Sequence, residues 1–212
     1  MGLNDELRKL AASRWGEGRM HQVYNALAAH LARTDAAKHA LKVGDALPDF
    51  VLPNAEGRLV SSHDLLAQGP LVVAFFRGDW CPFCNLTLAA LEDALPRIEA
   101  TKARLVAMTP DANGLALRAK HRNSLHYDVL CDIDNGVAMQ FGVVYRVPNE
   151  YRKFLEDYKC DLEARHGNDM WTLPMPSAFV IDRNGEIRYA FVNGDILERA
   201  EPDEIIKVLE KL

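Results

Sequence analysis

The chain has 212 residues, of which 49% are hydrophobic, so it can bury one core that carries peripheral additions. Its 30 acidic and 25 basic residues are interspersed and give a net charge of -5, which disfavours nucleic acids and anionic membrane surfaces as partners. No stretch approaches the roughly 20 apolar residues that span a bilayer, and the first ten residues show no signal-peptide pattern. We therefore expect a soluble, cytoplasmic protein.

The chain opens with a helical pattern from residue 3 to about residue 40. Apolar residues recur there at the spacing of one helix face, and Gly16 and Gly18 are predicted to separate two helices. We interpret residues 1–41 as an N-terminal helical extension and residues 42–212 as the main domain. The apolar positions that define the pattern are Leu3, Leu7, Leu10, Val23, Leu27 and Leu31.

The main domain is predicted to start with a short strand at residues 48–53 and a turn at residues 54–57. Residues 71–76 are continuously apolar, which is typical of a strand buried on both faces of a sheet. A helical pattern follows from Cys84, although Pro96 is expected to bend or restart that helix. A further strand over residues 104–109 then completes a strand-helix-strand unit.

The second half of the domain shows the same alternation in shorter elements. Residues 148–170 are charged and helix-compatible but have no place in a minimal alternating fold, so we interpret them as an insertion. Two apolar runs around a turn at residues 183–186 predict a β-hairpin. The class is therefore α/β with a central mixed sheet flanked by helices. The other predicted elements are helices at 115–122 and 135–141, strands at 127–131 and 142–145, and a closing helix with Pro202 in its first turn.

The segment Trp-Cys-Pro-Phe-Cys at residues 80–84 follows the apolar strand and opens a helix. Two cysteines three residues apart at a helix start can close a small disulfide ring, and unpaired backbone N–H groups stabilise a thiolate there. Pro82 suits the first helical position, which places Cys81 at the helix tip and Cys84 one turn inside. We expect an exposed Cys81 with the lower pKa to attack, Cys84 to resolve, and Trp80 to shield one side.

A zinc site is the main alternative for this cysteine pair. A closed zinc site needs two further ligands, whereas Cys131 and Cys160 stand singly and the seven histidines form no recognisable ligand pair. The strand-to-helix context favours redox chemistry without a metal or cofactor. Cys131 is interpreted as a small buried hydrophobe and Cys160 as an exposed thiol. Arg77 is interpreted as an ordinary solvated arginine, with stabilisation of a thiolate or peroxide as the alternative.

From residue 42 to about residue 210 the chain resembles a thioredoxin fold, and more closely the peroxiredoxin-like branch of the alkyl hydroperoxide reductase and thiol-specific antioxidant (AhpC/TSA) family. The segments that carry the resemblance are residues 44–50, 76–85, 109–111 and 175–182.

The resemblance includes a departure at the site itself. Ungapped placement puts the family's proline on Arg77, its threonine on Cys81 and its peroxidatic cysteine on Cys84. The family's peroxide-polarising arginine falls on Pro176, a position that resembles the cis-proline of thioredoxin. The resemblance therefore implies a thioredoxin-like site on a peroxiredoxin frame, with a cis peptide bond before Pro176 lying against the dithiol.

We expect a peroxiredoxin-like oxidoreductase that reduces hydroperoxides through a dithiol/disulfide cycle of Cys81 and Cys84. The family correspondence places the sulfenic acid on Cys84, whereas helix position favours Cys81, which we prefer. Thioredoxin, glutaredoxin or glutathione would restore the dithiol. The alternatives are a thioredoxin-like protein disulfide reductase without peroxidase activity and a redox-sensing interaction protein that uses residues 1–40 or 148–170. If these two segments bind no partner, we expect them only to add bulk to the domain or to support a homodimer.

Overall fold

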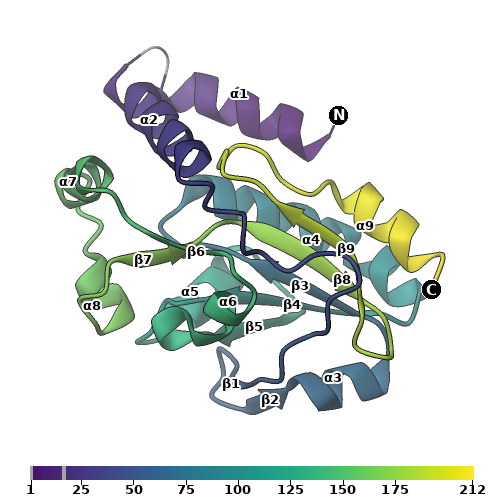
Figure 1. Cartoon of the computed structure of the whole chain (residues 1–212). Helices are drawn as coiled ribbons and strands as arrows, with labels where there is room; N and C mark the ends of the chain where they lie inside the picture. Colours follow the sequence, from purple (N-terminus) through teal and green to yellow (C-terminus); the bar gives the residue numbers. More distant parts are fainter. Residues whose placement is uncertain (1, 16–17) are drawn as a thin grey trace.

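The computed structural model describes residues 2–15 and 18–212, and its centre is a five-stranded mixed sheet in the order β5-β4-β3-β8-β9 (Figure 1). Neighbours β3, β4 and β5 run parallel, whereas β8 is antiparallel to both β3 and β9. The predicted mixed sheet is confirmed. The strands are β3 (Leu71–Phe75), β4 (Arg104–Thr109), β5 (Asp128–Cys131), β8 (Ser177–Ile181) and β9 (Ile187–Val192).

The middle strand of the sheet, β3, forms within the predicted apolar run of residues 71–76. All five of its residues are buried, because helices cover the sheet and the side chains of both strand faces lie in the core. The predicted hairpin of β8 and β9 also forms, and its turn is held by Asp182, whose carboxylate accepts the N–H groups of Asn184 and Glu186 at 2.9 and 3.1 Å. The apolar runs and the turn chemistry thus set the sheet.

Helix α4 (Pro82–Ala100) carries the cysteine pair at its first turn and packs with α9 (Pro202–Leu209). It continues across Pro96, so the predicted restart is wrong. Buried Leu95 and Ile98 on either side of that proline pack into the core, and their burial compensates for the missing backbone hydrogen bond. The other helices of this half of the fold are α5 (Leu115–Arg122), η1 (Ile133–Asn135) and α6 (Gly136–Gln140).

Several short elements complete the fold. The strands predicted at residues 48–53 and 142–145 form as β1 (Val51–Pro53) and β6 (Val144–Arg146), and each pairs antiparallel with a strand that was not predicted, β2 (Leu59–Ser61) and β7 (Thr172–Pro174) respectively. The seven-residue helix α3 (Ser62–Gln68) starts where the Ser61 hydroxyl accepts the N–H of Asp64 at 3.0 Å. The elements that were not predicted have three to seven residues and are too short for apolar periodicity to reveal.

The N-terminal segment forms α1 (Leu3–Trp15) and α2 (Arg19–Arg33), as two separate helices. Gly16 lies outside the described residues. The helix predicted to continue to about residue 40 ends at Arg33, and residues 34–40 form turns in which Asp35 has a left-handed backbone. In Figure 1 these helices lie over one side of the molecule, with α1 against α4 and α2 against α7 (Asn149–Asp157).

Residues 148–170 are helical as predicted, forming α7 and α8 (Leu162–His166). Buried Tyr151, Phe154 and Leu155 attach α7 to the rest of the protein, so this segment contributes side chains to the core. Within the described residues, no helix is both long and apolar enough to cross a membrane.

Candidate active site

The cysteine pair occupies the start of α4 as the sequence predicts. Cys81 is the N-cap residue, Pro82 takes the first helical position, and the Cys84 backbone N–H donates to Cys81 Sγ at 3.4 Å. Both sulfurs are free thiols in this structure, and both are buried, with exposed fractions of 0% for Cys81 and 1% for Cys84. The expectation of an exposed Cys81 is therefore wrong, since neighbouring segments cover the helix tip.

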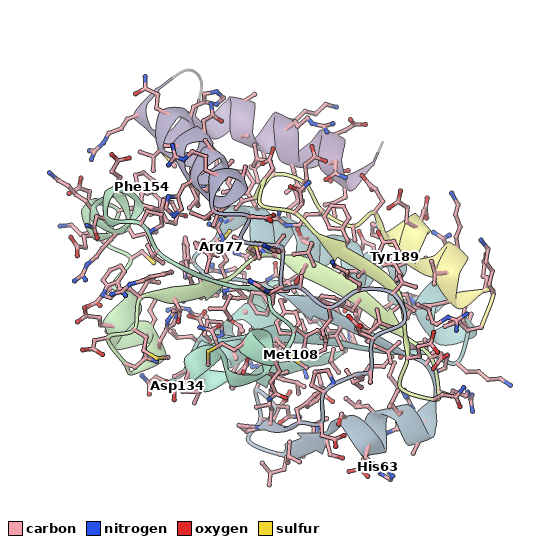
Figure 2. All side chains as sticks on the ribbon, in the orientation of Figure 1. His63, Arg77, Met108, Asp134, Phe154 and Tyr189 are labelled. Atoms are coloured by element: carbon pink, nitrogen blue, oxygen red, sulfur yellow. The ribbon has the colours of Figure 1, made fainter. Side chains whose placement is uncertain are left out.

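Arg77 is part of this buried site, and the interpretation as a solvated arginine is wrong. Its side chain is fully buried, Nη2 donates to Cys81 Sγ at 3.0 Å, and Nη1 donates to the Tyr151 hydroxyl at 2.8 Å. Figure 2 shows Arg77 in the interior of the molecule. Helices α2 and α7 supply part of this cover, because rings of Tyr24 and Tyr151 lie 5.7 and 6.0 Å from the guanidinium carbon.

The two thiols of the pair differ sharply in pKa. Burial acts to raise the pKa of Cys81, but the Cys84 thiol hydrogen bond, the Arg77 charge and the Cys84 N–H outweigh it and hold that pKa well below its ordinary value. Burial and the adjacent Cys81 hold the pKa of Cys84 well above its ordinary value. These shifts therefore favour a thiolate on Cys81 and a protonated thiol on Cys84.

Trp80 and Pro176 complete the set of predicted site residues. The Trp80 ring centroid lies 5.2 Å from the Arg77 guanidinium carbon, so the indole covers the cation that binds Cys81. Pro176 precedes β8, whose first residue, Ser177, pairs with Phe75 at the sheet end that carries the dithiol. The described residues contain no cis peptide bond, so the cis geometry expected before Pro176 is wrong.

The trans geometry at Pro176 has a local explanation. The Met175 N–H donates to the Val143 carbonyl at 2.7 Å, next to the β6–β7 ladder, and the chain then enters β8 directly. The short connection from β7 to β8 contains the trans peptide bond before Pro176. Trans is the lower-energy isomer of a bond before proline by about 0.5–1 kcal/mol.

A buried ion-pair network that the sequence did not reveal holds the loop before the cysteines. Both carboxylates, Asp79 and Asp111, are fully buried, and Arg165 of α8 bridges them, with Nη2 to Asp111 Oδ2 at 2.9 Å. Arg118 of α5 forms a second ion pair with Asp79. Gly78 fits only without a side chain, because a Cβ there would lie 2.7 Å from Asp111 Oδ2 and φ is +139°.

Replacing Asp79 with asparagine is expected to destabilise the fold by about 2 kcal/mol at pH 7, since it breaks a partly screened buried ion pair. Burial raises the pKa of Asp79, but hydrogen bonds and charges from Arg118 and Arg165 lower it overall. This stabilisation is therefore present above the unfolded pKa of about 3.9 and is lost as pH falls through the folded pKa.

Urea unfolding of the wild type and Asp79→Asn at pH 7 and pH 3 measures this difference. The gap between the two proteins should shrink at pH 3. Asp111 acts with the opposite sign, because burial raises its pKa and favours the protonated folded form. The Asp79 charge adds to that raise, so Asp79→Asn also changes the Asp111 contribution to the gap. A gap that stays constant with pH would show that Asp79 acts through packing alone.

The remaining cysteines differ from their predicted settings. Cys160, expected to be exposed, is buried at 4% exposure, and burial raises its pKa to about 12. Cys131 is half-buried at the end of β5, with its pKa raised chiefly by burial. Neither thiol is prepared as a nucleophile. Within residues 2–15 and 18–212, no group of three or more His, Cys, Asp or Glu side chains is arranged to hold a metal ion.

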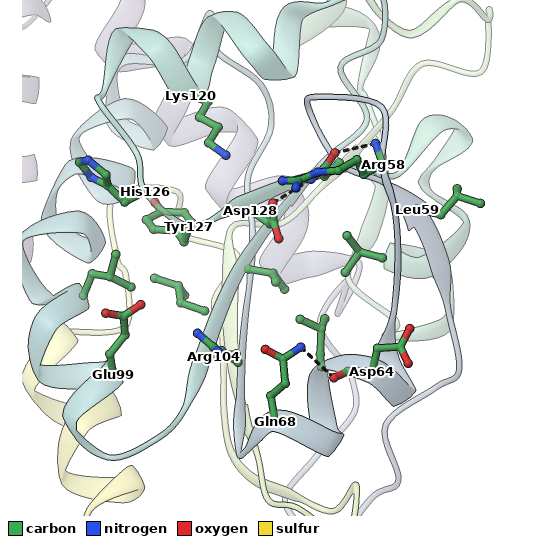
Figure 3. A pocket seen from close by; sticks show the side chains of 16 residues that line it. Arg58, Leu59, Asp64, Gln68, Glu99, Arg104, Lys120, His126, Tyr127 and Asp128 are labelled. Atoms are coloured by element: carbon green, nitrogen blue, oxygen red, sulfur yellow. Dashed lines mark hydrogen bonds between the residues drawn. The ribbon is translucent and has the colours of Figure 1, made fainter.

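A separate pocket lies far from the cysteine pair, at the opposite end of the strands. Figure 3 shows this hollow of about 470 Å³, and Arg104 in its wall begins β4 and pairs with Leu71 at the start of β3. Two of its charged groups are already paired, because Lys120 binds Glu56 at 2.6 Å and Asp128 accepts from an asparagine at 2.9 Å.

A sheet of this order with a buried reactive dithiol at a helix start defines a thiol oxidoreductase of the thioredoxin fold. The model described as the AhpC/TSA family matches residues 43–190, more than half of the sequence. The chain therefore belongs to the AhpC/TSA family, as the resemblance predicted.

Individual relatives include proteins of both expected activities. Chloroplastic peroxiredoxin Q of Oryza sativa subsp. japonica is 25% identical over 169 residues, covering 80% of this chain and 67% of that protein. Thiol-disulfide oxidoreductase ResA of Bacillus anthracis is 20% identical over 167 residues, 78% of this chain and 79% of that one. The solved structure of peroxidoxin BcpB from Mycobacterium tuberculosis matches 81% of this chain and 98% of that chain at a TM-score of 0.63 and 22% identity, which shows a shared fold.

Proposed function

We propose that this protein is a thiol-dependent peroxidase in which Cys81 is the nucleophile. The Cys81 thiolate attacks one oxygen of a hydroperoxide, the O–O bond breaks, and the alcohol or water leaves with a proton while Cys81 becomes a sulfenic acid. The Cys84 thiol then attacks the Cys81 sulfur, and water leaves as the disulfide forms. An external thiol system returns two electrons and two protons to restore the dithiol.

The observation that carries this proposal is the fully buried Cys81 thiol bonded to the Arg77 guanidinium. A peroxide is small enough to reach a covered sulfur after a local opening, and the developing negative charge of its leaving oxygen meets a cation already in place. Arg77 thus supplies at this site the charge that the family takes from the position of Pro176. Membership of the AhpC/TSA family supports the same reaction.

Protein disulfide reduction is the second candidate, because the cysteine spacing and the similarity to ResA favour it. Two features weigh against it. A protein disulfide needs access to the attacking sulfur, which is 0% exposed here, and the trans bond before Pro176 departs from the expected thioredoxin-like surface. A protein partner would have to displace the segments that bury Cys81 before reaching it.

We propose thioredoxin, glutaredoxin or glutathione as the source of reducing equivalents, since thiol exchange with the Cys81–Cys84 disulfide needs only a thiolate partner. A reducing compartment such as the cytoplasm is the proposed location. Its support is that a dithiol cycle depends on a reducing thiol pool.

The test compares two substrates on one protein preparation. Consumption of hydrogen peroxide and of an organic hydroperoxide is measured with each of the three reducing systems, alongside reduction of insulin disulfides. We expect turnover of a peroxide with at least one reductant, and insulin reduction lower than thioredoxin's by at least about a hundredfold, because access to Cys81 requires opening. Insulin reduction without any peroxide turnover would refute the peroxidase and establish the second candidate.

A further inference from the structure

A second arginine enters the site from a segment that carries no redox motif. Arg199 lies in the stretch between β9 and α9 and is 3% exposed. Its Nη1 donates to the Glu198 carbonyl at 2.7 Å, whereas Nε and Nη2 have no hydrogen-bond partner. Leaving guanidinium donors buried and unpaired is costly, so this side chain is held for an interaction that the resting dithiol does not complete.

The electrostatic interactions of Arg199 include both sulfurs. Burial lowers the pKa of Arg199, whereas the charges of the Cys84 and Cys81 thiolate forms, and a hydrogen-bonding interaction with the Cys84 side chain too weak to meet the hydrogen-bond geometry, act to raise it. Conversely, Arg199 favours the thiolate form of each cysteine. Arg77 also favours the thiolate of Cys84, more than Arg199 does. However, Arg77 Nη2 is bonded to Cys81 Sγ at 3.0 Å and Nη1 to the Tyr151 hydroxyl, whereas Arg199 keeps two buried nitrogens, Nε and Nη2, without a hydrogen-bond partner.

Helix α1 fixes the segment that carries this arginine. The Asn4 side chain accepts the Arg199 N–H at 2.8 Å and donates to the Arg199 carbonyl at 3.0 Å. The Glu201 carboxylate accepts the N–H groups of Leu3 and Asn4 at 2.8 and 2.9 Å. An outer ion pair joins Arg8 to Glu198 at 2.6 Å. The N-terminal extension therefore fixes the position of the Arg199 backbone through hydrogen bonds to both its N–H and its carbonyl group.

We propose that Arg199 stabilises the negative charge that develops on Cys84 Sγ when Cys84 attacks the oxidised Cys81, so that the two arginines serve the two sulfurs in turn. This inference rests on the proposed dithiol cycle. In the first step Arg77 holds the Cys81 thiolate. Once Cys81 is a sulfenic acid, its charge is gone. Cys84 then gives up its proton, its sulfur lone pair forms the S–S bond, and the hydroxyl of Cys81 leaves with a proton as water.

The test separates the two steps in a single turnover. Wild type, Arg199→Met and Arg199→Lys are mixed with one equivalent of hydrogen peroxide, sulfenic acid is trapped with dimedone, and disulfide formation is followed by mass spectrometry. For Arg199→Met we expect sulfenic acid to form within about twofold of the wild-type rate and disulfide formation to slow by about 10- to 100-fold, because a charge-assisted contact is lost. Lysine should restore part of the rate, with the pH profile close to wild type.

The control variant is Arg188→Met, a half-exposed arginine on β9 whose side chain forms ion pairs with Asp182 and Glu186 at the β8–β9 turn. It should leave both steps unchanged. Equal slowing of both steps in folded Arg199→Met, judged by circular dichroism and melting temperature, would overturn the proposal and assign Arg199 to the peroxide. An unchanged second step would overturn it as well.

A second assay keeps this inference separate from the peroxidase itself. Cys81 is converted to a mixed disulfide with 5-thio-2-nitrobenzoate, and attack by Cys84 is followed as release of that coloured thiol. The same slowing of about 10- to 100-fold is expected in Arg199→Met, since Cys84 again carries the charge. If the wild type forms no sulfenic acid with any peroxide but Arg199→Met slows this release, the peroxidase fails and the role of Arg199 stands. No slowing refutes the role.

Discussion

Replacing Cys81 with serine is expected to lower peroxide turnover by about a thousandfold or more, as loss of a covalent nucleophile does in other enzymes. The structure assigns the low thiol pKa to Cys81, because Arg77 and the start of α4 favour its thiolate while Cys84 is held protonated. Cys84→Ser should retain the first reaction with peroxide, since serine still offers a hydrogen-bond donor to Cys81, and then stop at the sulfenic acid.

Rapid-mixing measurements with dimedone trapping compare these two variants directly. A dimedone adduct on Cys81 in Cys84→Ser, and none in Cys81→Ser, is the expected pattern. The reverse pattern would show that the family correspondence, which places the peroxidatic cysteine on Cys84, governs the chemistry. Cys160→Ser serves as the matched control, because that buried thiol is held protonated with a pKa of about 12 and should contribute nothing to either step.

Arg77→Met is expected to slow the reaction of Cys81 with peroxide by about 10- to 100-fold at pH 7. A hydrogen bond to a charged group contributes about 1.5–3 kcal/mol, and each 1.36 kcal/mol corresponds to a factor of about ten. Removing Arg77 removes a group that lowers the pKa of Cys81, so the thiolate fraction at pH 7 falls. Activity should therefore recover as the pH is raised above the ordinary pKa of a thiol.

The pH dependence of the first step distinguishes a charge effect from loss of packing. Arg77→Lys should recover part of the rate, because lysine keeps the charge but not the forked geometry that also reaches Tyr151. Tyr151→Phe removes only the hydroxyl and should cost about two- to tenfold. A folded Arg77→Met protein with the wild-type pH profile would contradict this assignment.

The central sheet was accessible from sequence because its signals are local. Each of its strands has four to six residues and is mostly apolar, and the hairpin turn carries its own asparagine and glycine. Of the three-residue strands, β1 and β6 were predicted, whereas β2, β7 and the short helix α3 were missed because they are too short to show a reliable pattern. The end of α2 was overestimated, since the apolar spacing continues into turns that Asp35 begins.

The cysteine pair was predictable because its spacing, its proline and the start of the helix lie within five residues. The charged side chains that surround the pair could not be predicted from the sequence. Arg77 is near in sequence, but its burial depends on Tyr24 and Tyr151, which belong to distant helices. Arg199 lies far along the chain in a segment held by Asn4. Contacts between segments that are distant in sequence decide which arginine is buried beside a sulfur, so a local sequence pattern cannot predict this burial.

The complete cover over Cys81 determines how the protein fares when peroxide is abundant. A second peroxide molecule can convert a sulfenic acid to the irreversible sulfinic acid only if it arrives before the resolving thiol reacts. Here that second arrival requires another opening of the site, because Cys81 is fully buried, whereas Cys84 already lies beside Cys81 in the closed state. Damage from excess oxidant is thus set by a competition between two rates, the opening of the site and the formation of the disulfide.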